Sequence, residues 1–350
     1  MSIKIDNQTI GKNHPVFIIA EAGVNYNNDL KLAYKMIDSA KSVGANAIKF
    51  QTFVTELIQL PSTKKPNYQK SIKKNYFQIL KDLEPNFDDQ KKIANYCKKK
   101  KIIFLSTPYD KVSVDFLESL NIPAYKIASS DFSNHLLLEY ILKKRKPILL
   151  STGLSTDKQI NETINFLKTF KILKKLILLH TNSDYPTKPH DVNLNIIPNL
   201  RKSFNLIVGF SDHTTDEISS LGAVALGASV IEKHFTLDRN LPGPDQSSSL
   251  EPDELKLFIK KIRILEKSLG NSKKIITNSE RNNLSMKKIL VIKSAKKGSI
   301  ITLSMLTALR GNGKILPTHN NIKKIIGKKL VKSILKPSPF NWSMITNSEI

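Results

Sequence analysis

Two histidines, His213 and His234, each end a short apolar run, and a helical pattern of small residues separates the runs. A strand, a helix and a second strand in this order form a parallel pair, because the crossover returns the chain to its starting level. The two imidazoles should therefore emerge side by side, with the carboxylates of Asp212 and Glu232 close to them. Imidazoles and carboxylates bind divalent cations or orient other ligands. The spacing predicts a metal site at His213 and His234.

Short apolar runs recur along the first part of the chain and are nearly continuous rather than alternating, as in strands that are buried on both faces. Helical patterns lie between them, as at 29–43 and 88–100. No glycine-rich phosphate fingerprint follows the first run. Eight strand and helix units over roughly 250 residues predict a (β/α)8 TIM barrel rather than an open doubly wound sheet. The runs are 16–21, 47–51, 102–107, 125–130, 148–153, 176–186, 206–213 and 230–235.

In such a barrel, the residues that do chemistry gather at the carboxyl ends of the strands, where the loops converge on the axis. Polar residues follow every run: Glu21, Lys49, Gln51, Thr107, Lys126, Ser129, Ser151, Ser183, Tyr185, Ser211, His213, Glu232 and His234. Two ammonium groups with several hydroxyls bind phosphate and carboxylate oxygens well. The set predicts a site for a small phosphorylated acid. The alternative is that the hydroxyls only cap the helices that follow them.

The composition changes after Gly270, which predicts a barrel over residues 1–270. The segment 271–284 is polar and has little periodicity, as a linker would. Residues 285–350 contain short β-leaning runs separated by turns and predict a compact, β-rich domain.

The formal net charge is +25, from 55 Lys and Arg against 30 Asp and Glu. Only six of these cations are Arg, and no aromatic residues are interleaved with the lysines, which favours a solvated surface over a nucleic-acid site. Cys97 is the only cysteine, so an intrachain disulfide is excluded and a reducing cytoplasm is expected. No window approaches the roughly 20 apolar residues of a spanning helix, so we expect neither an export signal nor a membrane partner.

Motifs along nearly the whole chain resemble those of the sialic acid synthase family, which comprises N-acetylneuraminate synthase and its relatives. They are IAEAGVNYNNDLKLAYKMIDSAKSVGANAIKFQTF, STPYD, YKIASSDFSN, LSTGLS, the Tyr185-Pro186-Thr187 turn, GFSDHT, EKHFTLDRNLPGPDQSSSLEPDEL and RGNG. The resemblance implies a barrel followed by a small antifreeze-like (SAF, β-clip) domain, in a domain-swapped homodimer. It also implies condensation of phosphoenolpyruvate with N-acetylmannosamine and water to give N-acetylneuraminate and phosphate, with Mn²⁺, Mg²⁺ or Co²⁺.

The same resemblance implies a role for each matching residue. Phosphoenolpyruvate would be held by Lys49, Thr107, Lys126, Ser129, Ser151, Ser183 and Ser211. The sugar and the reacting water would be served by Glu21, Gln51, Tyr185 and Asp245, with Arg310 reaching the partner's active site. The catalytic set would be Glu21, Lys49, Lys126, His213 and His234, with the two histidines on the metal. Three positions depart from the family pattern: Thr181 replaces a frequent Cys, Ser183 stands where some members have Asn, and no proline follows Arg310.

In the mechanism that we expect, the enol carbon of phosphoenolpyruvate attacks the sugar aldehyde, whose oxygen the cation polarises. Water then adds at the adjacent carbon and phosphate leaves by C–O cleavage. Glu21 is the candidate to orient or deprotonate this water, while Lys49 and Lys126 stabilise the substrate's anionic groups.

Three other functions remain open from the sequence. A sister synthase that makes legionaminic or pseudaminic acid would share these residues and differ in the sugar pocket. An enzyme of the 3-deoxy-octulosonate type would need a second, Arg-rich phosphate site, and none is evident. A lysine-rich protein with a decayed active site, binding carbohydrate or nucleic acid, would show no turnover.

Overall fold

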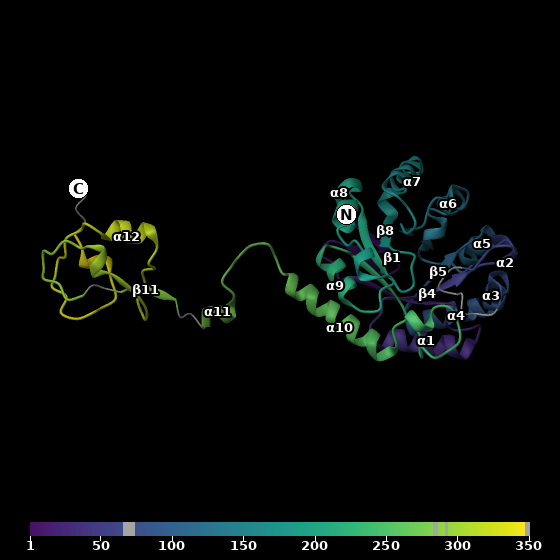
Figure 1. Ribbon diagram of the computed structural model, residues 1–350, viewed down its shortest axis with the longest axis horizontal. Helices are drawn as coiled ribbons and strands as arrows, with labels where there is room; N and C mark the ends of the chain where they lie inside the picture. The colour runs from purple at the N-terminus through teal and green to yellow at the C-terminus, as the bar shows by residue number, and fades with distance from the viewer. Residues whose placement is uncertain (66–73, 283–285, 291–292, 347–350) are drawn as a thin grey trace. The chain divides into compact units, whose positions relative to one another are not determined.

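The computed structural model describes residues 1–65, 74–282, 286–290 and 293–346. The chain divides into two compact units, Met1–Gly270 and Asn271–Ile350 (Figure 1). The end of the predicted linker at 283–284, and positions 291–292 in the apolar run that follows it, lie outside the described residues.

Eight parallel strands form a nearly closed ring in the first unit. They are β3 (Phe17–Gly23), β4 (Ala47–Thr52), β5 (Ile103–Pro108), β6 (Tyr125–Ile127), β7 (Ile148–Ser151), β8 (Leu176–Thr181), β9 (Ile207–Asp212) and β10 (Val230–His234). Their order is β5-β4-β3-β10-β9-β8-β7-β6, and β5 and β6 at its two ends are in contact. The predicted (β/α)8 barrel is confirmed. Strand β6 is shorter than predicted because Ser129–Asp131 turns into a 3-10 helix.

Helices surround this ring (Figure 1). They are α1 (Leu30–Ser42), α4 (Phe87–Lys100), α5 (Lys111–Ser119), α6 (His135–Leu142), α7 (Asp157–Thr169), α8 (Ile196–Phe204), α9 (Ile218–Ala225) and α10 (Pro252–Leu269). The side chain of Asp29 caps α1 by accepting from the main-chain N–H groups of Lys31 and Leu32. Two short helices, α2 (Thr55–Ile58) and α3 (Tyr76–Leu83), lie between β4 and α4 and were not predicted.

An N-terminal hairpin closes the amino end of the barrel and was also missed by the sequence analysis. Its strands are β1 (Ser2–Ile5) and β2 (Gln8–Gly11), which pair antiparallel. Ile5 and Ile10 are fully buried in a core cluster with the residues that fill the lower part of the barrel, such as Phe17. The hairpin therefore buries apolar surface that the barrel's amino end would otherwise expose.

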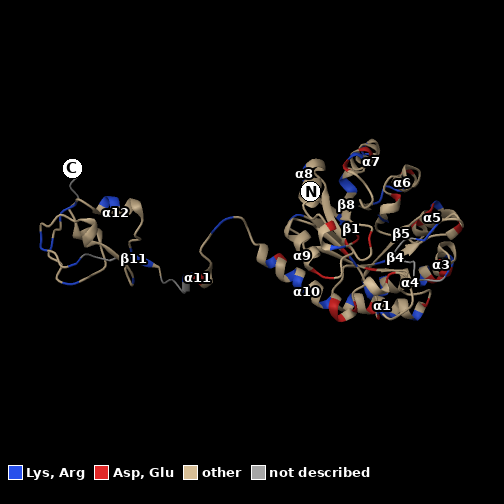
Figure 2. Ribbon diagram, in the orientation of Figure 1, with Lys and Arg blue, Asp and Glu red and all other residues tan. Residues whose placement is uncertain are grey.

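The second unit contains α11 (Asn278–Asn282), β11 (Lys287–Leu290), β12 (Thr307–Arg310) and α12 (His319–Ile325). Strands β11 and β12 pair antiparallel, and isolated bridges such as Ala295 to Ile334 add to them. Over the described residues of this unit, there is less regular strand structure than the sequence led us to expect. Residues 286–346 include no Asp or Glu, and Figure 2 shows Lys and Arg as the charged residues around β11 and α12.

Candidate active site

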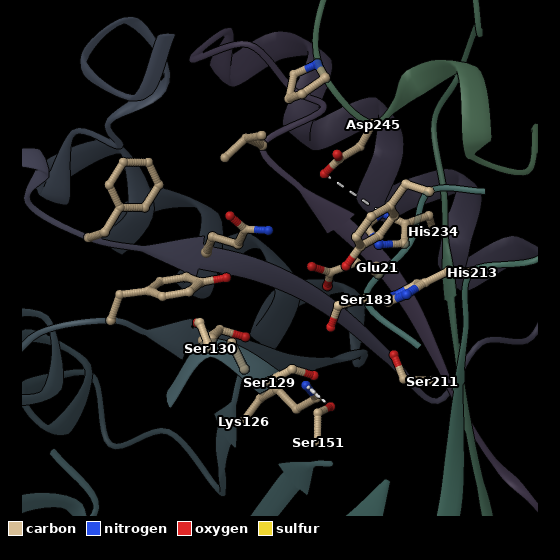
Figure 3. Close-up of a pocket in the computed structure, with 18 of the residues that line it drawn as sticks. Glu21, Lys126, Ser129, Ser130, Ser151, Ser183, Ser211, His213, His234 and Asp245 are labelled. Carbon is tan, nitrogen blue, oxygen red and sulfur yellow. Dashed lines mark hydrogen bonds and ion pairs between the residues drawn. The ribbon is translucent and has the colours of Figure 1, made fainter. Parts of the chain in front are cut away.

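Because side chains alternate along a strand, every second residue points into the barrel. These inward residues are apolar at the amino end of the barrel and polar at the carboxyl end. On β3, Phe17 and Ile19 belong to the apolar core at the amino end, and Glu21 follows them on the same side. The inward residues at the carboxyl ends line one cavity of about 440 Å³ (Figure 3). The cavity is lined by all the predicted barrel site residues, namely Glu21, Lys49, Gln51, Thr107, Lys126, Ser129, Ser151, Ser183, Tyr185, Ser211, His213, His234 and Asp245.

Two buried lysines and two buried glutamates lie at the centre of this cavity. Lys49 Nζ lies 2.8 Å from Glu21 Oε2 and 3.8 Å from Glu232 Oε2. Lys126 Nζ donates to Ser151 Oγ at 2.7 Å and lies 3.7 Å from Glu232 Oε1. Each ammonium group therefore lies close to a carboxylate inside the cavity, and the carboxylate of Asp245 lines the same cavity.

The surroundings shift the pKa values of these groups in different directions. Burial raises the pKa of Glu21, although Lys49 opposes this effect. Burial would also raise the pKa of Glu232, but Lys126 and Lys49 outweigh it and hold this pKa well below its usual value. Burial lowers the pKa of Lys126. Glu232 is thus a permanent counterion for both lysines, whereas Glu21 can take up and release a proton.

The two histidines lie side by side, as the sequence predicted. Their ring centroids are 5.3 Å apart, and the ring of Tyr185 lies 4.1 Å from that of His213. His213 Nδ1 is 2.5 Å from the carbonyl oxygen of Asn182, so this nitrogen carries the proton and Nε2 keeps its lone pair. Burial lowers the pKa of His213 to about 4 and that of His234 well below its usual value. Both rings are therefore neutral at pH 7.

These two imidazoles fit a divalent cation as two of its ligands. His234 Nδ1 is buried and has no hydrogen-bond partner in the part of the chain that the structure describes, and a carboxylate oxygen of Asp245 lies 3.9 Å from it. Over the described residues, however, no group of three or more His, Cys, Asp or Glu side chains is arranged to hold a metal ion. A cation at His213 and His234 would take its other ligands from water or substrate, as catalytic metal sites do.

Asp212 directly precedes His213, but its carboxylate does not face the cavity with the two histidines. Its carboxylate points out of the barrel and accepts from the N–H of Thr214 at 2.8 Å and from Ser220 Oγ at 2.5 Å. The reason is the strand alternation, because Asp212 stands between Ser211 and His213, which both line the cavity. Of the two carboxylates that were expected close to the histidines, only Glu232 faces the cavity.

Hydroxyl groups form the wall next to the lysines. Figure 3 shows Lys126 and Ser151 together at one end of the labelled residues and His234 and Asp245 at the other, with Ser129 and Ser130 close to Lys126. A Cβ at Gly153 would lie 2.5 Å from both Ser129 Oγ and Ser183 Oγ. Only glycine leaves room there for both hydroxyls. Arg310, the remaining predicted site residue, ends β12 in the second unit and is exposed.

The cavity is also lined by residues that the sequence analysis missed. Tyr109 follows β5, and its place in the STPYD motif after a predicted strand was the signal that could have revealed it. Ile58 comes from α2, and Tyr76 and Leu80 come from α3. No sequence pattern indicated that the segment between β4 and α4 reaches the cavity, because its helices are short.

The fold and the site define a (β/α)8-barrel protein with a cavity at the carboxyl ends of its strands that is lined by lysines, hydroxyl groups and histidines. Residues 36–274 match the model of the NeuB family, and the chain belongs to this family. It is 42% identical to the N,N'-diacetyllegionaminic acid synthase of Campylobacter jejuni over 84% of this chain and 90% of that protein. It is 33% identical to human N-acetylneuraminate-9-phosphate synthase over 97% of this chain and 95% of that protein.

A solved structure is also similar. The crystal structure of the N-acetylneuraminic acid synthetase from Leptospira borgpetersenii matches with a TM-score of 0.71 and 35% identity, covering 81% of this chain and 95% of that one. The family match confirms the family resemblance seen in the motifs, and it ends at residue 274, close to the start of the second unit. No helix among the described residues is long and apolar enough to cross a membrane.

Proposed function

We propose that this chain condenses phosphoenolpyruvate with an N-acetylated hexose and water, giving a sugar acid and phosphate. The observation that carries the proposal is the cavity itself, in which two buried lysines and several hydroxyls lie next to two neutral histidines. The names of the relatives support it, because both the legionaminic acid synthase and the N-acetylneuraminate-9-phosphate synthase make acidic sugars.

The lysines and the hydroxyls bind the anionic substrate. Lys126 with Ser151, and Lys49 with Thr107, are two cation and hydroxyl pairs, joined at 2.7 Å and 3.1 Å. Phosphoenolpyruvate carries a phosphate and a carboxylate, so each pair receives one anionic group. Ser129, Ser183 and Ser211 supply further donors. Burial strengthens these interactions because water does not screen them.

The histidines and Glu21 act at the reacting carbons. A divalent cation, when bound by His213 and His234, supplies Lewis acid polarisation of the sugar's aldehyde oxygen. The enol carbon forms the new C–C bond to the aldehyde carbon, whose oxygen takes up a proton. Water adds at the adjacent carbon and gives its proton to Glu21, whose raised pKa suits this role. The C–O bond to phosphate then breaks: phosphate leaves with the bonding electrons and takes the proton of the hydroxyl that water supplied, whose oxygen becomes the keto oxygen of the product. The proton on Glu21 replaces the one taken up by the aldehyde oxygen.

N-acetylmannosamine is the sugar that the sequence motifs imply. A second candidate is a hexose with two acetamido groups, which would give an N,N'-diacetylated acid like that of the Campylobacter relative. The apolar part of the cavity favours this second candidate, because Phe53, Ile58, Leu80 and Leu154 line it with surface that suits an additional methyl group.

The test of the function is phosphate release from phosphoenolpyruvate with a panel of N-acetylated hexoses, in the presence and absence of Mn²⁺. We expect release that depends on both the sugar and the metal, with the preferred sugar deciding between the two candidates. No release with any sugar would overturn the proposal.

Isotope labelling tests the C–O cleavage. In water enriched in ¹⁸O, we expect the label at C2 of the product and not in the released phosphate, because in the proposed reaction water adds at C2 and the bridging oxygen leaves with phosphorus. Mass spectrometry of both products measures this. Label in phosphate would mean P–O cleavage and a different enzyme.

The active site is completed by Arg310 of the partner subunit in a domain-swapped homodimer. The described residues that line the cavity include no arginine, although a guanidinium group suits phosphate and carboxylate. We expect Arg310→Ala and Glu21→Ala to be nearly inactive separately. After mixing and refolding they should regain up to about a quarter of wild-type activity, because half of the dimers are mixed and each has one intact site. Mixed dimers without activity would contradict an arginine that acts across the dimer.

A further inference from the structure

An ion pair lies behind the two histidines, on the outer side of the barrel. Lys233 of β10 and Asp212 of β9 are cross-strand neighbours, and Lys233 Nζ lies 3.1 Å from Asp212 Oδ2. The side chains are 1% and 0% exposed. Since side chains alternate along a strand, both point away from the cavity, whereas Glu232, His234 and His213 line it. The proposed reaction makes no use of this pair.

Every polar atom of the pair has a partner in the segment that follows His213. Asp212 Oδ1 accepts from the N–H and the hydroxyl of Thr214, at 2.8 Å and 2.7 Å. Its Oδ2 accepts from Ser220 at 2.5 Å. Lys233 Nζ donates to the carbonyl oxygens of Thr214 and Asp216, at 2.5 Å and 3.0 Å. The residues on both sides of His213 are thus fixed by one ion pair.

A buried ion pair is weak evidence for stability, because removing two charges from water costs about as much as their attraction returns. Apolar residues of similar volume often replace such pairs without loss of stability. Apolar residues cannot, however, hold the neighbouring backbone in one orientation. Packing alone allows a backbone segment to shift, whereas directed hydrogen bonds keep it in place. The network therefore suits a role in orienting the residues beside it.

The position of His213 also affects the loop after β8, the strand that pairs with β9. Its carbonyl oxygen accepts from the N–H of Thr187 at 2.9 Å, and its Nδ1 bonds the carbonyl oxygen of Asn182. Between these two positions lies Tyr185, whose ring packs on that of His213. A shift of the backbone at His213 would move Tyr185 with it.

We propose that Lys233 and Asp212 are positioning residues, which fix the separation of the His213 and His234 imidazoles and thereby the affinity for a divalent cation. The inference rests on the proposed function for the identity of this ligand. Through His213, the ion pair also fixes the position of the Tyr185 ring relative to the bound sugar.

The test is the double variant Asp212→Asn, Lys233→Met, which removes both charges and leaves neither partner buried alone. Mn²⁺ binding to the full chain is followed by the electron paramagnetic resonance signal of the free ion. We expect affinity about 10-fold weaker or more, the range in which outer-shell partners act. Circular dichroism and the stabilisation of the chain by phosphoenolpyruvate should stay as in the wild type. The matched control is Arg263→Met, Glu266→Gln, a pair 3.0 Å apart on α10, which should bind Mn²⁺ as the wild type does.

A second measurement needs no metal. The ¹⁵N chemical shifts of the imidazoles report whether His213 keeps its bond to Asn182, and we expect the double variant to lose this bond. Unchanged shifts and unchanged Mn²⁺ affinity in the folded variant would overturn the proposal. If the variant does not fold, Ser220→Ala replaces it, with smaller changes expected in the same direction. If the wild type itself binds no Mn²⁺, the proposed cation is wrong, and the imidazole shifts decide the positioning role separately.

Discussion

Turnover should fall to background in excess chelator and return when Mn²⁺ is added. His213→Ala and His234→Ala should each weaken Mn²⁺ binding by more than about 100-fold, because loss of a ligand exceeds the loss of an outer-shell partner. Neither substitution should unfold the barrel, since both side chains lie at strand ends above the apolar core. Calorimetric titration with Mn²⁺ and thermal denaturation measure the two effects.

His180 offers a matched control for these variants. It is also a buried histidine near the end of a strand, but its Nε2 lies 2.6 Å from the carbonyl oxygen of Val192, and it does not line the cavity. His180→Gln should keep the wild-type affinity for Mn²⁺. Full activity in excess chelator would contradict the metal's role, and equal losses in all three variants would mean that the histidines act through the fold.

Lys126→Met should lower kcat/KM for phosphoenolpyruvate by about 100-fold or more, because the cavity loses a donor aimed at an anionic group. Most of this loss should appear in KM, since the substrate is charged in its ground state as well as in the transition state. The substitution also leaves Glu232 with one cation fewer, so some loss of stability is expected. Steady-state kinetics at saturating sugar measure the effect.

Variants of Lys49 provide a comparison with Lys126→Met. Lys49→Met alone leaves Glu21 without its partner at 2.8 Å, whereas Lys49→Met with Glu21→Gln removes both charges. We expect the double variant to regain stability but not activity. Thermal denaturation separates the two variants, because an unpaired buried charge costs about 3–5 kcal/mol. An unchanged KM in every lysine variant would mean that the anion binds elsewhere.

Much of the fold follows from the sequence for a simple reason. Strands buried on both faces must be apolar throughout, so the runs that became β3 and β4 could be located to within a residue or two. Their polar ends then predicted the site, because the carboxyl ends of barrel strands meet. The same alternation predicts that the side chain of Asp212 points outward, and therefore that its carboxylate does not line the cavity.

Other parts could not be predicted because they depend on contacts between distant segments. The hairpin of β1 and β2 is too short to have a convincing pattern, and Ile5 is buried only because the barrel above it is open at that end. Similarly, Leu80 reaches the cavity through the position of α3, which no local signal indicated. The bond from His213 to Asn182 depends on where the loop after β8 lies.

The pairing of β3 with β10 has a consequence for how the chain is made. Phe17 is opposite Val230, and Glu21 is opposite His234, so the first barrel strand to leave the ribosome needs a partner more than 200 residues later. Until then the nascent chain holds a strand with one open edge, and such edges invite pairing with other chains. During synthesis, protection from pairing with other chains is thus most important for β3, the barrel strand that is translated first.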